Sequence, residues 1–283
     1  MTGTRILWGL LVLLLGACAG NPDGYDTRLS GVVGFAEDVR FLADPGTGYV
    51  EAYLRFGADL PADVIIFVDQ ELLEGVTNYR WTKGGDWMAF VGFQRDGTVW
   101  VGGGSDAALA GTPSRERNWK LFELGQALLP DTWYRVRVTA DFASRRFLGF
   151  EIEGGGLARR LDLSGVPLDY PNYIPFDRGS MIYLVGAVRA RKWATQSGRP
   201  LVFFDDVVGA VRDGDRYRTV FANDFEKQTT VGPQPVTLPV VKLDNYTMGW
   251  WYQENEASLF RIERRPFARS GAAVGVADVT LAK

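Results

Sequence analysis

The chain has 283 residues, of which 46% are hydrophobic and 13% are aromatic, and its formal net charge is −3. This length suits one large domain or two small ones, and no basic tract points to a nucleic-acid partner. The sequence has no histidine and a single cysteine. Their scarcity excludes a Ser-His-Asp triad, a Cys-His pair, a disulfide and a histidine-ligated zinc site, so catalysis would depend on carboxylates, tyrosine, lysine or arginine.

The N-terminus has the pattern of an export signal. Arg5 precedes the apolar run 6–15, and small residues stand directly before Cys18. The run is too short to span a bilayer as a mature helix and ends in a cleavage site. Leu15-Gly16-Ala17-Cys18 resembles the lipobox of bacterial lipoproteins, which implies removal of residues 1–17 and a lipid on Cys18. An ordinary secretory signal with a chance cysteine is the alternative.

Residues 18–30 are polar and rich in turn formers, so we expect the lipidated Cys18 to be followed by a short tether. Ala19 occupies the position where an aspartate would favour retention in the inner membrane. We therefore expect a protein anchored to the bacterial envelope through its lipid, at the outer membrane.

From residue 31 onward the hydrophobic pattern has a period of two, which is typical of strands with one solvated face. The predicted core residues in its two clearest segments are Val50, Ala52, Leu54 and Phe56 in 49–56, and Tyr134, Val136 and Val138 in 133–139. Continuous apolar runs at 64–68, 181–185 and 201–204 suit strands that are buried on both faces.

Turn signals separate these segments. Asp96-Gly97 predicts a hairpin between 90–94 and 98–101, and 141–146 predicts a longer turn before a strand at 146–152. A weak helical signal lies at 116–129. Strands recurring about every 8–12 residues predict an all-β fold, a two-sheet antiparallel β-sandwich.

The domain boundaries follow from composition. We expect the β-sandwich to occupy 31–232 and a C-terminal extension to occupy 233–283, where it packs on the sandwich or completes it. Pro233, Pro235 and Pro239 mark the start of this extension.

Two stretches resemble the concanavalin A-like lectin/glucanase superfamily, the laminin-G-like jelly rolls. Residues 129–138 (LPDTWYRVRV) are similar to a strand with alternating apolar positions after a tryptophan, and 202–208 (VFFDDVV) are similar to the closing strand of these sandwiches. The resemblance implies a jelly-roll fold. Because this fold hosts lectins, glycosidases, lyases and adhesion modules, it leaves the function open.

Asp205 and Asp206 form a candidate metal site. Adjacent carboxylates at a strand end offer the hard oxygen ligands that calcium prefers. The resemblance implies a structural calcium near an aspartate of this kind. The alternative is an aspartate that accepts hydrogen bonds from loop amides while its neighbour faces solvent.

Glu151 and Glu153 are the candidate catalytic residues. They lie on the same face of a predicted strand, about 7 Å apart. Glycosidases use two carboxyl groups about 5–5.5 Å apart when they retain configuration and farther apart when they invert it. Glucanases of this fold carry a longer acidic pattern, so the alternative is a solvated strand face whose glutamates pair with arginines.

The candidate ligand-binding residues are aromatic. Trp81 and Trp87 flank a glycine-rich segment, and Trp250-Trp251-Tyr252 precedes polar residues. Sugar rings stack their C–H faces on indole and phenol rings, while neighbouring polar groups bind their hydroxyls. Large aromatic side chains also fill protein cores, which is the alternative.

These features favour binding over catalysis. We expect an envelope protein that recognises a glycan or a partner protein through the sandwich. The first alternative is a carbohydrate-active enzyme, either a glycoside hydrolase or a polysaccharide lyase, although a lyase of this fold usually uses a histidine or a longer tyrosine motif. The second alternative is a non-catalytic structural subunit of an envelope complex.

Overall fold

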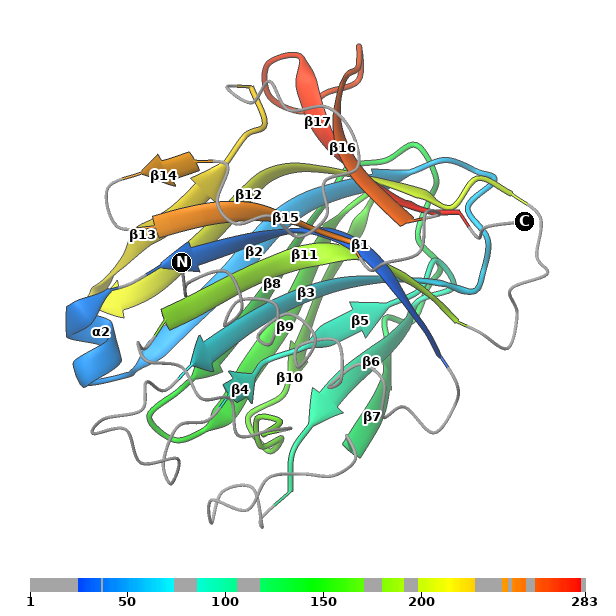
Figure 1. The fold of residues 1–283 in the computed structure, drawn as a ribbon. Helices are drawn as coiled ribbons and strands as arrows, with labels where there is room; N and C mark the ends of the chain where they lie inside the picture. The colour runs from blue at the N-terminus through cyan, green and yellow to red at the C-terminus, as the bar shows by residue number, and fades with distance from the viewer. Residues whose placement is uncertain are drawn as a thin grey trace.

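The computed structural model describes residues 25–36, 38–73, 86–105, 118–170, 180–190, 198–226, 241–243, 246–252 and 258–280. In these residues the chain forms two antiparallel sheets that pack face to face (Figure 1). This confirms the predicted all-β, two-sheet antiparallel sandwich. Among the described residues, no helix is long and apolar enough to cross a bilayer.

The first sheet, here called sheet A, has nine strands in the order β14-β15-β1-β11-β3-β5-β6-β7, with β4 paired to β3. Its strands are β1 (Tyr25–Ala36), β3 (Val64–Leu73), β4 (Asp86–Met88), β5 (Val91–Phe93), β6 (Thr98–Gly103), β7 (Asn118–Glu123), β11 (Ser180–Ala190), β14 (Val241–Leu243) and β15 (Tyr246–Tyr252). Both neighbours of β1 therefore come from much later in the chain.

The second sheet, sheet B, has eight strands in the order β10-β9-β8-β2-β12-β17-β16, with β13 paired to β12. Its strands are β2 (Thr47–Phe56), β8 (Tyr134–Asp141), β9 (Arg146–Gly154), β10 (Leu157–Asp162), β12 (Leu201–Asp213), β13 (Arg216–Asn223), β16 (Ser258–Arg264) and β17 (Ala273–Val279). The first half of β12 pairs with β17 and the second half with β13.

The core lies between the sheets, and the predicted alternation is confirmed in β2 and β8, where every second residue is buried. The runs at 64–68 and 181–185 lie in β3 and β11, which are buried on both faces as predicted. The prediction for 201–204 was wrong, because Leu201 and Phe203 are only half-buried and alternate with buried residues on the edge of a solvated face.

The predicted hairpins are present. β5 pairs with β6, and Gly97 between them has φ +97°, which a residue with a side chain rarely adopts. The helical interpretation of 116–129 was wrong for the described part of that segment, because 118–123 is β7 and pairs with β6. Backbone hydrogen bonds to an available strand edge outweigh a weak helical propensity.

The described helix is α2 (Val39–Ala43), which lies at one end of the sandwich (Figure 1). The sequence patterns did not predict it. Asp38 begins it, because its carboxylate accepts a hydrogen bond from the backbone N–H of Phe41. Asp38 also pairs with Arg218 of β13, so this ion pair fastens the helix to sheet B.

Two glycines of sheet B allow polar side chains of sheet A into the core. A Cβ atom on Gly209 would lie 2.5 Å from the ring of Tyr183, and one on Gly48 would lie 2.3 Å from Nε2 of Gln70. Burial raises the pKa of the Tyr183 hydroxyl, so this phenol stays protonated at all physiological pH values. The two sheets therefore contact each other through these polar side chains and glycines as well as through the apolar core.

Candidate functional site

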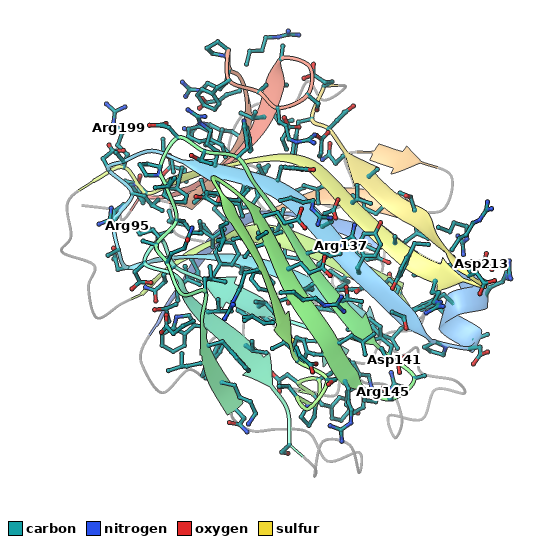
Figure 2. The ribbon with its side chains drawn as sticks, turned by 180° about the vertical axis from the view of Figure 1, so that it is seen from behind. Arg95, Arg137, Asp141, Arg145, Arg199 and Asp213 are labelled. Atoms are coloured by element: carbon teal, nitrogen blue, oxygen red, sulfur yellow. The ribbon has the colours of Figure 1, made fainter. Side chains whose placement is uncertain are left out.

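The outer face of sheet B carries an array of charged and aromatic side chains that contact each other across strands. β2, β8 and β9 lie side by side there and direct alternate residues outward. Figure 2 views this side of the molecule, with Arg137 near its middle. The outward residues are charged or aromatic because the same strands direct their apolar residues into the core.

Glu151 and Glu153 lie on this face and are paired with arginine. Arg135 lies 2.8 Å from Glu153 and 3.7 Å from Glu151, and Arg160 lies 3.8 Å from Glu151. Arg135 also contacts Glu51 of β2 at 3.0 Å. The two glutamates thus belong to a charge network across neighbouring strands, an arrangement typical of a solvated strand face.

Tyr49 and Tyr217 form an aromatic corner at the β13 side of this face. Their ring centroids are 4.9 Å apart and the rings meet at 66°. Tyr217 is 43% exposed and is the one exposed aromatic residue among those whose side chains the structure describes. The guanidinium of Arg137 lies 4.2 Å from the centroid of Tyr49, and its Nε donates to Glu51 at 2.7 Å.

The electrostatics of the corner keep the phenol of Tyr49 neutral. Burial raises the pKa of this hydroxyl, and the charge of Arg137 offsets part of the rise. A neutral phenol can both donate and accept a hydrogen bond. The corner therefore offers one exposed ring, one neutral hydroxyl and a fixed arginine–glutamate pair within a small area.

Asp205 and Asp206 hold the loop between β16 and β17. The carboxylate of Asp205 accepts hydrogen bonds from the backbone N–H groups of Arg269 at 2.9 Å, Ser270 at 3.1 Å and Asp206 at 2.8 Å. Burial raises the pKa of Asp205, and these hydrogen bonds offset part of the rise. Asp206 has φ +46° at a register shift of β12, which turns its carboxylate to the guanidinium of Arg269.

These contacts bear on the calcium hypothesis. Donor groups of the protein face the carboxylates of Asp205 and Asp206, and a cation would have to displace the Arg269 guanidinium. Among the described residues, no three Asp, Glu, Cys or His side chains gather as a metal site would need. The contacts of Asp205 and Asp206 suit an anchor for this loop and do not suit a calcium site. Calcium binding by this pair is therefore a prediction that these contacts do not support.

The aromatic residues that the sequence singles out as ligand-binding candidates lie in other parts of the chain than Tyr49 and Tyr217. Trp87 is buried at 5% exposure, its ring stacks on Tyr170 with centroids 4.4 Å apart, and Arg145 lies 4.7 Å from its centroid. Trp81 lies outside the described residues. Trp250, Trp251 and Tyr252 form part of β15 and pair with β1, and their side chains lie outside the description. Cys18 also lies outside it.

A second group of acids lies in β3. Asp69 and Glu71 are two residues apart, so their side chains share one face about 7 Å apart. This is the outer face of sheet A, because Gln70 between them points to Gly48 of sheet B. Both acids are buried, at 0% and 1% exposure, next to apolar residues such as Phe67.

The sequence patterns missed both groups. Tyr49 and Tyr217 are far apart in the chain and meet only because β12 pairs with β2 on one side and β13 on the other. Asp69 and Glu71 had a visible signal, since they directly follow the apolar run 64–68 inside one strand. Acids that continue such a run are costly to bury, which makes them candidates for function.

Comparisons with known proteins place no family name on this chain. No family model matches it, and no curated protein matches it. Among solved structures, scytalido-glutamic peptidase with a transition state analog inhibitor is 12% identical, with 89% of this chain and 98% of that chain covered and a TM-score of 0.37.

Two alginate lyases are also similar. Alginate lyase A1-II', a member of polysaccharide lyase family 7, is 15% identical with a TM-score of 0.24, covering 51% of this chain and 63% of that one. Alginate lyase PA1167 from Pseudomonas aeruginosa is 12% identical with a TM-score of 0.23, covering 52% and 65%. Likenesses this low carry no argument about ligand or activity, which must come from the side chains.

Proposed function

We propose that this chain is a lipid-anchored envelope protein that binds a glycan on the outer face of sheet B, at the Tyr49–Tyr217 corner. The observation that carries the proposal is the exposed ring of Tyr217 beside Tyr49, with an arginine–glutamate pair directly behind it. Anchoring through Cys18 would raise the effective concentration of this face at the envelope.

The corner has the chemistry that a sugar ring requires. An exposed aromatic ring offers an apolar surface to the C–H face of a sugar, and the partly exposed groups around it can bind hydroxyls. Arg137 and Glu51 are held by each other and by Tyr49, so little side-chain entropy is lost when a ligand binds. A glycan fits this combination of one stacking surface with fixed polar groups.

The test is glycan binding by the purified full chain on a broad glycan array. We expect binding without product formation, and we expect Tyr217→Ala to weaken it by about tenfold or more, because the stacking surface is removed. Leu121→Ala is the matched control, since Leu121 is similarly exposed at 59% but lies on β7 of sheet A. Binding that survives Tyr217→Ala unchanged would contradict this site.

A second candidate function is hydrolysis by a carboxyl pair, and Asp69 and Glu71 are the observation that favours it. Two carboxyl groups on one strand face can divide the roles of general acid and general base or nucleophile. This site differs from the predicted pair Glu151 and Glu153, which is tied up with Arg135.

Hydrolysis is tested on the same glycans by following reducing ends. If the pair is catalytic, Glu71→Gln should abolish product formation while Glu151→Gln leaves it intact. Product formation that persists in both variants would reject carboxyl chemistry at either pair. No binding and no product with any glycan would favour a protein partner in an envelope complex.

A further inference from the structure

The outer face of sheet B repeats one arrangement four times, with an arginine stacked on an aromatic ring and paired with a carboxylate. The four triads are Tyr49–Arg137–Glu51, Tyr53–Arg269–Asp206, Phe267–Arg55–Asp131 and Phe203–Arg265–Glu263. The guanidinium carbons lie 4.2, 3.4, 4.5 and 5.6 Å from the ring centroids, in that order.

The triads come from different parts of the chain and meet in one layer. β2 supplies Tyr49, Glu51, Tyr53 and Arg55, while the loop after β16 supplies Arg265, Phe267 and Arg269. The rings of Phe203 and Phe267 are 5.0 Å apart and join two of the triads. The loop is fixed to the face by Asp205, and the Trp133 indole donates to the carbonyl of Phe267 at 2.8 Å.

Each triad holds its arginine between a ring and a carboxylate and neutralises its charge. Stacking on the ring and pairing with the carboxylate fix the guanidinium in one orientation. Every positive charge in a triad has a negative charge next to it. The same balance extends to Arg135, which lies among Glu51, Glu151 and Glu153. The face is therefore rich in charged groups and has little net charge.

The charge balance selects among glycans. An anionic sugar would find no surplus of positive charge, and its carboxylate would have to displace one that an arginine already holds. Sugar hydroxyls, in contrast, can accept from outward N–H groups and donate to outward carboxylate oxygens without breaking a pair. We infer that the ligand of this face is an uncharged glycan, an inference that rests on the proposed glycan binding.

The inference is tested by calorimetric titration of the full chain with cellohexaose and maltohexaose as uncharged probes and with hexagalacturonate as the anionic probe. We expect an uncharged hexamer to bind, with an affinity that changes by less than about twofold between low and high salt. Tighter binding of hexagalacturonate, lost at high salt, would overturn the inference.

A substitution tests whether the charge balance of this face causes the preference for an uncharged glycan. Glu51→Gln removes the carboxylate that neutralises Arg135 and Arg137. We expect this variant to gain salt-sensitive affinity for hexagalacturonate of about fivefold or more, because Arg137 loses the carboxylate it pairs with and Arg135 keeps only Glu151 and Glu153. Asp162→Asn is the control, since it removes an exposed acid of β10 whose carboxylate accepts a hydrogen bond from the backbone N–H of Ser164. An equal gain in both variants would overturn the local explanation.

The outcomes separate the two proposals. Binding of hexagalacturonate alone, abolished by Tyr217→Ala, would leave the glycan-binding function standing and reject its uncharged ligand. Binding of none of the three hexamers, together with silence on the glycan array, would reject the function and the inference together.

Discussion

The outer faces of the two sheets differ in how far they are exposed and in how they accommodate charged residues, although they belong to one sandwich. The outer face of sheet A is buried along β3, where all ten residues are buried, including Asp69 and Glu71. The outer face of sheet B is open, and its charged residues are paired across strands. A charged residue is thus unusual on one face and ordinary on the other.

This difference shows how acidic residues in a β-sandwich can be judged as candidates for function. Glu151 and Glu153 attract attention by their spacing, but they lie where an exposed sheet normally carries charge. Asp69 and Glu71 have the same spacing on a buried face, where charged side chains are rarely found. Position on a face therefore says more about function than spacing along the strand.

The largest expected effect comes from the buried face of sheet A. Phe67 is 1% exposed, and its ring stacks on Phe90 with centroids 5.2 Å apart. We expect Phe67→Ala to lower the free energy of unfolding by about 3–5 kcal/mol, because a large buried ring leaves a cavity. Urea denaturation measures this. A loss below about 1 kcal/mol would show that this face is not packed as described.

Acid should destabilise the fold through its paired carboxyls. Burial alone would raise the pKa of Glu263, but Arg261 and Arg265 outweigh it and lower the pKa. Burial alone would also raise the pKa of Asp38, but Arg218 outweighs it and lowers the pKa. The backbone N–H groups of Ala273 and Ala272 lower the pKa of Glu226.

A lowered pKa means that the unfolded chain binds the proton more readily than the folded one. The stabilisation by these carboxyls is therefore complete above their ordinary pKa values and is lost as the pH falls through the folded values. Asp205, whose pKa is raised by burial, works in the opposite direction. We expect the melting temperature to fall between pH 5 and pH 3, since the lowered pKa values of Glu263, Asp38 and Glu226 outweigh the raised pKa of Asp205. A melting temperature that rises over this range would contradict the pairing.

A smaller effect is expected within the charge network of sheet B. Arg135→Met keeps much of the apolar stem and removes the charge that three glutamates share. We expect the free energy of unfolding to fall by about 1 kcal/mol, and by less in high salt, as for partly exposed ion pairs. Arg159→Met is the control on β10, where Arg159 forms no ion pair with the described residues. Equal losses in both variants would argue against a network.

The smallest effect is expected at the proposed binding corner itself. Tyr217 is exposed, so Tyr217→Ala should change the free energy of unfolding by less than about 0.5 kcal/mol. The same substitution should still reduce glycan binding. A loss of stability as large as the loss of binding energy, measured by thermal unfolding, would mean that Tyr217 serves the fold.

Much of the fold could be predicted because alternation is a local property. Val50, Ala52, Leu54 and Phe56 in β2, and Tyr134, Val136 and Val138 in β8, point inward as their pattern indicates. The Asp96-Gly97 turn is also local, since Asp96 accepts from the N–H of Thr98 at 2.9 Å. Strand pairing is not local, so the patterns give the two sheets without giving their strand order.

The candidate site was harder to predict because it depends on that strand order. Tyr49 belongs to a predicted strand, yet only the placement of β13 brings Tyr217 to it. The same is true of Asp205, which resembles a metal ligand in the sequence and holds the β16–β17 loop in the structure. Chemistry that needs two distant segments is visible only when the sheets are assembled.

The position of β1 has a consequence for the making of the protein. Neither of its partners, β11 and β15, is near it in the chain, so its hydrogen bonds to β11 must wait until residue 190 has been synthesised and those to β15 until residue 252. Pairing across such separations is slow. Sheet A therefore cannot be completed until most of the chain has been synthesised.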